Sequence, residues 1–184
     1  SYPVMEDVAP KRESWKHHLS LAMIQKDGRC LTTTITHAAY LGREASTDNA
    51  PEVMEDHLWN IIPKNVNGCP VDIGGALYCA KKVGYIRHFY RLETFDEYKE
   101  VIGTHAVLIG HEMSEGMLDT SEVGGGFIGP TTPPLLDKAG KVRMHVALLL
   151  GRDPHWFTGR YSTYKSTGGP SWGGRISEAK ITDK

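Results

Sequence analysis

The sequence predicts an α+β protein, because its two halves have different patterns. In the first half, apolar residues recur at helical spacing within segments 32–44, 51–61 and 75–82. In the second half, short β-branched or apolar runs alternate with glycine and proline clusters, which is typical of strands and turns. Helical segments followed by strands indicate an α+β class.

Three helices are expected in the first half. The segment 32–44 starts with threonines, whose hydroxyls are expected to cap the first free N–H groups. Threonines are poor helix formers, so packing against the rest of the chain must stabilise this helix. The second helix opens at Pro51, an accepted first-turn residue, and the third stops at Gly84 in a C-cap position.

The second half is expected to hold short strands separated by turns. They are predicted at 106–109, 126–128, 142–150, 160–164 and 175–181. The chain of 184 residues is long enough to bury a core and is expected to form a single domain, 1–184. Its helical part covers about 12–100 and its strand-rich part about 101–184, and the N-terminal arm crosses over to the strand-rich part.

Composition argues against several functional classes. A formal net charge of −1 provides no electrostatic footprint for nucleic acid or an anionic membrane. No apolar run approaches the roughly 18 to 20 residues that span a bilayer. The histidines lack metal-site spacing, and the glycines at 124–126 lack the lysine of a phosphate-binding loop. We therefore expect no nucleic acid, membrane span, metal or cofactor.

Five short motifs occur in an informative order. They are Gln25–Cys30, Asn67–Cys69, Gly125–Pro130, His145–Gly151 and Ser166–Gly173. In order and spacing, this series resembles the papain-like cysteine peptidases. The segment 105–110 copies the family's histidine motif more literally, but only His145 is followed at the expected reach by Pro170-Ser171-Trp172-Gly173. The resemblance implies two lobes, a helical one packed on a strand-rich, barrel-like one.

The resemblance also locates the family's functional positions, most of which are changed. A cysteine peptidase needs a thiolate at a helix N-terminus, a histidine paired with it and an amide that orients the histidine. Counting from Cys30, the nucleophile position falls on Thr33, the amide position on Ser166 and the oxyanion-hole position on Asp27. A carboxylate there would repel the developing negative charge. The histidine position keeps its residue, His145.

Two more positions differ from the family pattern. The indole that shields the amide corresponds to Gly168, and the open Gly-Gly pair reads Pro70-Val71, which removes an N–H and adds bulk. Structural roles are favoured for the residues that remain. Thr33 and Thr34 are expected to cap or pack at the helix start, and His145 to be a hydrogen-bonded strand residue.

These changes predict a catalytically inactive papain-like homologue that acts as a binding or structural component of a protein assembly. Shortened loops and few cysteines suit a chain that a protein partner stabilises. The rival hypothesis is a repurposed enzyme (a hydrolase, transferase or cyclase) that uses His145 with Thr33 or Asp27. A small-molecule ligand in the former cleft is a further alternative.

The three cysteines allow at most one internal disulfide. The resemblance favours Cys30 with Cys69, leaving Cys79 as a buried, inert thiol. A bridge closing a loop of about 40 residues would add roughly 3 to 4 kcal/mol and would favour a secreted, vacuolar or lysosomal location. The alternative is three reduced thiols in a reducing compartment, so localisation stays open.

Overall fold

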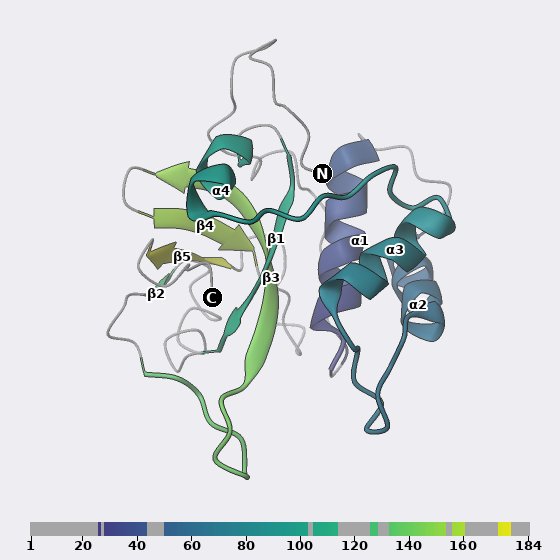
Figure 1. The fold of residues 1–184 in the computed structure, drawn as a ribbon, viewed down its shortest axis with the longest axis horizontal. Coiled ribbons are helices and arrows are strands. Elements are labelled where there is room, and N and C mark those ends of the chain that lie inside the picture. Colours follow the sequence, from purple (N-terminus) through teal and green to yellow (C-terminus); the bar gives the residue numbers. More distant parts are fainter. Residues whose placement is uncertain are drawn as a thin grey trace.

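The structure is a computed structural model that describes residues 26, 28–43, 50–102, 105–113, 126–128, 133–153, 156–160 and 173–177. The elements in chain order are α1 (Cys30–Arg43), α2 (Pro51–Ile61), α3 (Ile73–Lys82), α4 (Phe95–Val101), β1 (Val107–Glu112), β2 (Gly126–Ile128), β3 (Met144–Asp153), β4 (Trp156–Arg160) and β5 (Gly173–Ser177). Mixed helices and strands confirm the α+β class (Figure 1). Among the described residues, no helix is long and apolar enough to cross a bilayer.

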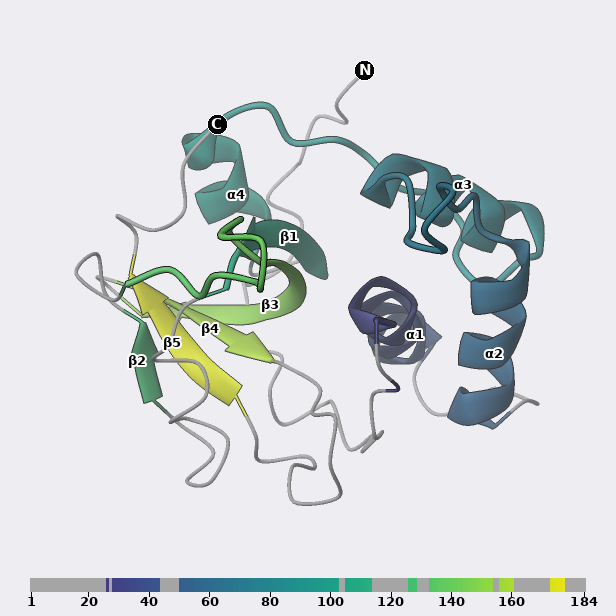
Figure 2. The ribbon, with the colours of Figure 1, turned by 90° about the horizontal axis from the view of Figure 1, so that it is seen from below.

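Helix α1 lies between the sheet and the other two large helices. It packs against β3 on one side and against α2 and α3 on the other, as the two perpendicular views show (Figures 1 and 2). The short helix α4 lies with the sheet instead. This layering places the start of α1 at the junction between the helices and β3.

The five strands form one sheet in the order β1-β3-β4-β5-β2. Its pairs are antiparallel except β2 with β5, which is parallel. In the β1–β3 pair, Val107 lies opposite Leu149 and His111 lies opposite His145. Among the described strands, β1 and β2 do not pair with each other, so the barrel-like closure that the resemblance implies is not among the pairings present.

The sheet separates two apolar clusters. One contains Leu31, Ile35 and Leu58, and the helices enclose it together with Leu108 and Val146 from the sheet. The other contains Val107, Ile109, Met113, Ala147 and Leu149, on the face that the residues at the end of α4 cover. Because successive strand residues point to opposite faces, the even-numbered positions of β1 and of residues 144–149 in β3 face the helices and the odd-numbered positions face away from them.

The start of α1 differs from the expectation. The helix begins at Cys30, two residues before the predicted segment 32–44, and it ends at Arg43. The threonine hydroxyls do not cap free N–H groups. Instead they donate to carbonyls, as Thr34 does to Val146 (3.3 Å) and Thr36 to Thr32 (2.8 Å). The helix therefore starts where its packing against β3 starts, rather than at a side-chain cap.

The next two helices match the prediction closely. Helix α2 opens with Pro51 in its first turn, as expected. Helix α3 starts at Ile73, two residues early, because Asp72 accepts a hydrogen bond from the Gly75 amide and caps it. Beyond its end, Gly84 has a φ of +83°, which glycine adopts without strain.

Helix α4 was not predicted, although its signal is visible in the sequence. Thr94 accepts a hydrogen bond from the Glu97 amide, and the Glu97 carboxylate accepts from the Thr94 amide, which is a complete capping box. Tyr98, Val101 and Ile102 pack on the sheet. Residues up to about 100 were expected to belong to the helical half. Helix α4, at the end of this range, packs with the strands instead.

The later strands are offset from the prediction. Strand β3 covers Met144–Asp153 rather than 142–150. Strand β5 covers Gly173–Ser177, and residues 178–181 of the strand predicted at 175–181 lie outside the described residues. Strand β4 covers Trp156–Arg160 and pairs with β3, with Trp156 opposite Asp153, whereas residues 161–164 of the strand predicted at 160–164 lie outside the described residues. The strand predicted at 126–128 matches β2, and the one predicted at 106–109 extends as β1 to Glu112.

Candidate functional site

The junction between α1 and β3 is the candidate site, because it holds the residues that the resemblance singles out. Cys30 is the first residue of α1, and its thiol interacts with the backbone of Val146 in β3. Burial raises the pKa of the Cys30 thiol, and the hydrogen bond from the Val146 backbone only partly opposes this. One turn later, Thr34 donates to the Val146 carbonyl. At neutral pH the thiol is therefore protonated.

Thr33 is not the first residue of α1. It lies within the first turn, 1% exposed, and Cys30 occupies the helix start. Among the described residues, the Thr33 hydroxyl has no hydrogen-bond partner. Of the two structural roles expected for Thr33, capping or packing, its burial fits packing, and its side chain carries a buried polar atom.

His145 is buried near the start of β3, on the sheet face that points away from α1. It shares this face with Ala147 and Leu149, whereas its neighbour Val146 faces the helices. Burial, and to a smaller extent the nearby charges of His111 and Arg143, lower the pKa of His145 to about 3. The imidazole is therefore neutral at physiological pH.

His111 is a partly buried histidine beside His145 that the sequence did not reveal. It lies directly opposite His145 in the β1–β3 pair, and the two rings meet edge to face with centroids 5.8 Å apart. Its Nδ1 lies 2.7 Å from the Glu112 carbonyl oxygen. Burial lowers the pKa of His111 too. The positions 111 and 145 become neighbours only through the strand register, so no local motif could have indicated this pair.

The structure thus brings only part of the predicted site together. Cys30 and Thr33 lie in the first turn of α1, and Thr34 contacts β3 from the same helix. His145 lies on β3 but faces the other side of the sheet. The remaining predicted positions, Asp27, Ser166 and Gly168, lie outside the described residues.

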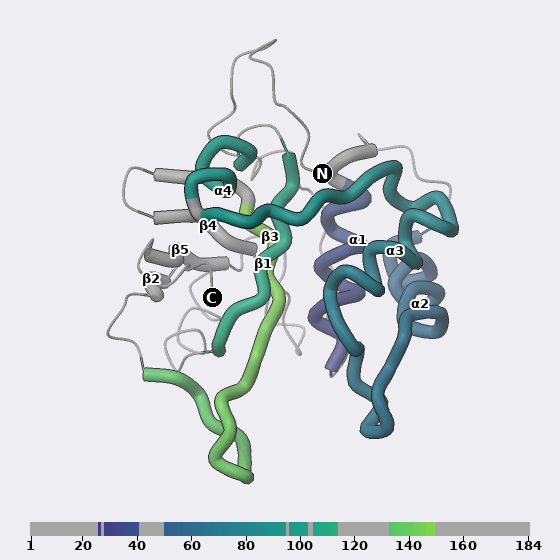
Figure 3. Tube along the Cα trace, viewed as in Figure 1, coloured from purple at the N-terminus to yellow at the C-terminus, as the bar shows by residue number. Residues whose placement is uncertain are grey.

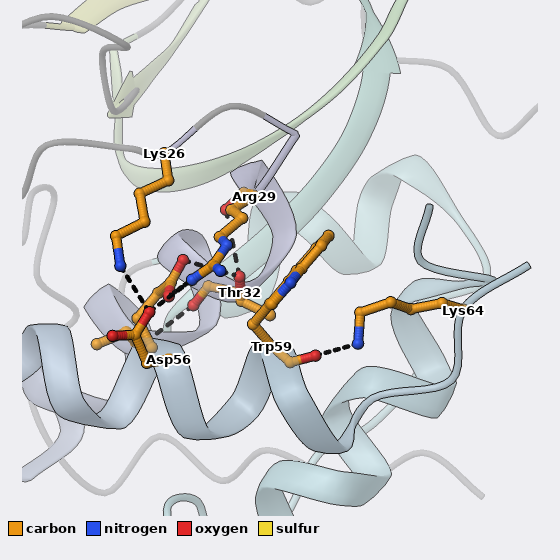
Figure 4. A network of polar contacts seen from close by, with 8 residues as sticks. Lys26, Arg29, Thr32, Asp56, Trp59 and Lys64 are labelled. Carbon is orange, nitrogen blue, oxygen red and sulfur yellow. Dashed lines mark hydrogen bonds and ion pairs between the residues drawn. The ribbon is translucent and has the colours of Figure 1, made fainter. Parts of the chain in front are cut away.

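Helix α1 is also held to α2 by a network of ion pairs, in which only the Glu55 side chain is buried and which the sequence analysis did not identify (Figure 4). The Arg29 guanidinium contacts Glu55 at 3.0 Å and Asp56 at 2.6 Å, and Lys26 contacts Asp56 at 2.7 Å. The Thr32 hydroxyl adds a 3.3 Å hydrogen bond to Glu55. Burial raises the pKa of Glu55, whereas hydrogen bonding and charge from Arg29 lower it.

An aromatic ring completes this network. The Arg29 guanidinium lies over the Trp59 indole, 4.9 Å from the ring centroid, and the Lys64 ammonium lies 4.7 Å from it. The Lys64 ammonium also donates a hydrogen bond to the Trp59 carbonyl (Figure 4). Cations over an indole face are attracted by the ring quadrupole. Because both carboxylates are already paired with cations, the network serves to fix the start of α1 rather than to react with a substrate.

The Cys30–Cys69 disulfide that the resemblance favours is not formed in this structure. All three cysteines are free thiols. Cys69 is exposed in a turn held by Asn65, whose side chain accepts from the Cys69 amide at 3.1 Å, whereas Cys30 faces β3. Cys79 is only partly buried, and its sulfur lies 3.7 Å from the Ile61 carbonyl oxygen. The structure therefore provides no disulfide argument for an oxidising compartment.

Comparison with protein-family models and with curated proteins finds no match to this chain. The papain-like resemblance therefore rests on the ordered motifs alone. Within the described ranges, no group of three or more histidine, cysteine or acidic side chains is arranged to hold a metal ion.

Proposed function

We propose that the chain is a papain-like homologue without peptidase activity that acts as a binding component of a protein assembly. The observation that carries this proposal is the orientation of His145, which lies on the sheet face away from α1 and from the Cys30 thiol. A cysteine peptidase requires the imidazole and the residue at the helix start to face each other.

The protonation states support the same proposal. Papain-like catalysis uses a thiolate and an imidazolium that stabilise each other, with a thiol pKa well below its usual range. Here burial shifts both groups toward their neutral forms, since the pKa of Cys30 is raised and that of His145 is lowered to about 3. A neutral thiol beside the backbone of Val146 is a poor nucleophile.

The rival, a repurposed enzyme, gains no support from the described geometry. A hydroxyl nucleophile needs a base within hydrogen-bond reach. The Thr33 hydroxyl is buried without such a partner among the described residues, and His145 faces the opposite side of the sheet. The described residues therefore do not support the Thr33–His145 pairing of this rival, and Asp27, its other candidate, lies outside them.

A binding role is supported by apolar side chains that are exposed to solvent in this structure. Val66 and Val71 are exposed in the loop between α2 and α3, and Leu136 and Met144 are exposed on and beside the hairpin that precedes β3. Both segments project from the same end of the molecule (Figure 1). Exposed apolar side chains on projecting segments supply contact area for a protein partner.

Two measurements test the proposal. The purified chain and a His145→Ala variant are incubated with broad panels of peptide and ester substrates, and we expect no turnover from either. Turnover that disappears in the variant would instead establish the repurposed enzyme. Purification of the untagged protein from its source should recover a second polypeptide by co-elution. A chain that elutes alone would contradict the binding role.

A further inference from the structure

The segment 81–91 carries an excess of positive charge in a chain that is nearly neutral. Its cations are Lys81, Lys82, Arg87 and Arg91, and residues 73–92 contain no aspartate or glutamate. The whole chain has a formal net charge of −1. Positive charge is therefore concentrated in one short stretch rather than spread over the surface.

These cations are exposed, and most lack an acidic partner. Within the part of the chain that the structure describes, Lys81, Lys82 and Arg87 form no ion pair, and the Lys82 ammonium only approaches the Tyr78 ring at 5.8 Å. Arg91 lies 3.6 Å from Glu93, with both side chains mostly exposed, and such pairs are weak. By contrast, Arg29 in the α1–α2 network has two carboxylate partners.

The fold holds this segment at both ends. Tyr85 and Ile86 pack against the helical cluster, and Leu92 packs against the cluster on the sheet. Between these anchors the chain runs from the end of α3 across to α4 (Figures 2 and 3). The intervening cations are thus presented on a stretch whose course is fixed before any partner binds, which lowers the ordering cost of binding.

Stabilisation of α3 explains only part of this charge. Lys81 and Lys82 lie in the last turn, where cations interact favourably with the helix dipole. Arg87 and Arg91 lie in the connection beyond the helix and have no such role. Tyr90 is exposed beside them.

We propose that segment 81–91 is the docking surface for an acidic segment of a partner protein, an inference that rests on the binding role proposed above. Arginines bind carboxylates through two parallel hydrogen bonds, and exposed tyrosines add apolar contact area. Nucleic acid and membranes fit less well. Binding to either is typically driven by domain-wide positive charge, whereas this chain has a pI of about 6.7.

The test measures fluorescence anisotropy of a labelled polyglutamate peptide on titration with the intact chain. We expect binding that weakens as salt is raised and that is absent for a peptide with serine in place of glutamate. R87E/R91E, which changes no helix, and K81E/K82E should each weaken binding by about tenfold or more. K138E/K141E makes the same change in net charge on the exposed hairpin and should bind like the wild type.

Equal loss in all three variants, or no loss in R87E/R91E, would overturn the docking surface. Stronger binding to oligo-dT or to phosphatidylserine vesicles than to polyglutamate would overturn the class of partner. Co-elution from the source separates this inference from the proposed function. A partner retained by R87E/R91E would contradict the docking surface alone, whereas no partner for the wild type would contradict the binding role itself.

Discussion

The α1–α2 interface and the β1–β3 pair both bury titratable side chains, but they stabilise them differently. Between the helices, Glu55 keeps an arginine within 3.0 Å and a threonine hydroxyl within 3.3 Å. Between the strands, His111 and His145 meet each other, and burial lowers the pKa of both. The helix interface pairs the Glu55 carboxylate with the opposite charge of Arg29. The strand pair instead favours the neutral forms of its two histidines.

This difference explains why a histidine at an expected position does not by itself supply an acid or a base. An imidazole takes part in an ion pair only where its surroundings stabilise the charged form. His145 has a second histidine and the positive charge of Arg143 nearby, both of which oppose protonation. The environment of His145, rather than its presence in the sequence, argues against catalysis.

Acidification should destabilise the strand region before the helical region. Below about pH 6.5 an unfolded histidine binds a proton, whereas folded His145 resists protonation down to a pKa of about 3. The unfolded state therefore binds more protons in this window, and stability falls as the pH falls. Between pH 7 and pH 4 we expect His145 to account for a loss of about 3 kcal/mol in the free energy of unfolding, measured with urea.

Replacing His145 should remove this dependence. His145→Leu is expected to flatten the fall in stability between pH 7 and pH 4, whatever its effect at pH 7. His88→Leu removes an exposed histidine and should leave the pH profile unchanged. Parallel profiles for the wild type and His145→Leu would show that His145 is not the group that resists protonation.

Removing the compensating cation should destabilise the helical region by a somewhat smaller amount. Arg29→Met leaves the Glu55 carboxylate, whose side chain is only 4% exposed, without its arginine. We expect a loss of about 2 kcal/mol in the free energy of unfolding, because the guanidinium itself is partly exposed to solvent. Adding Glu55→Gln should recover part of the loss. Lys26→Met removes an exposed cation and serves as the control. If Arg29→Met lowers the free energy of unfolding no more than Lys26→Met does, the Arg29–Glu55 pair does not stabilise the helical region as proposed.

The threonines of α1 should give the smallest effects and should differ from one another. Thr34→Val removes a hydrogen bond to β3 and should cost about 1 kcal/mol. Thr33→Val removes a buried hydroxyl that has no partner among the described residues, so it should leave stability unchanged or slightly raised. Thermal unfolding of the two variants under identical conditions checks this order. Equal losses would mean that the Thr33 hydroxyl is bonded after all.

Local patterns predicted the helices better than the site. Proline at the start of α2 and glycine beyond α3 set limits that act within a few residues, and the structure keeps both. The start of α1 was misplaced because contacts with β3, more than 100 residues away, take the place of a local cap. Helix α4 was missed although the Thr94–Glu97 capping box is a local signal.

The site depends on information that the linear sequence does not contain. Whether His145 faces α1 is decided by the pairing of β3 with β1, and a shift of one residue would turn its side chain to the other face. The same register creates the contact with His111. Motif matching identified the histidine correctly as a strand residue, but it could not indicate the face or the pKa that decides its chemistry.

The most direct test of the account is the pH dependence of iodoacetamide alkylation at Cys30, followed in a C69S/C79S variant. Because burial raises the pKa of the Cys30 thiol and His145 is neutral and faces away, alkylation should stay slow through neutral pH and accelerate only at alkaline pH. Fast alkylation below pH 7 that is lost in a further His145→Ala variant would reveal a thiolate–imidazolium pair. That result would contradict the claim that this chain has lost its peptidase chemistry.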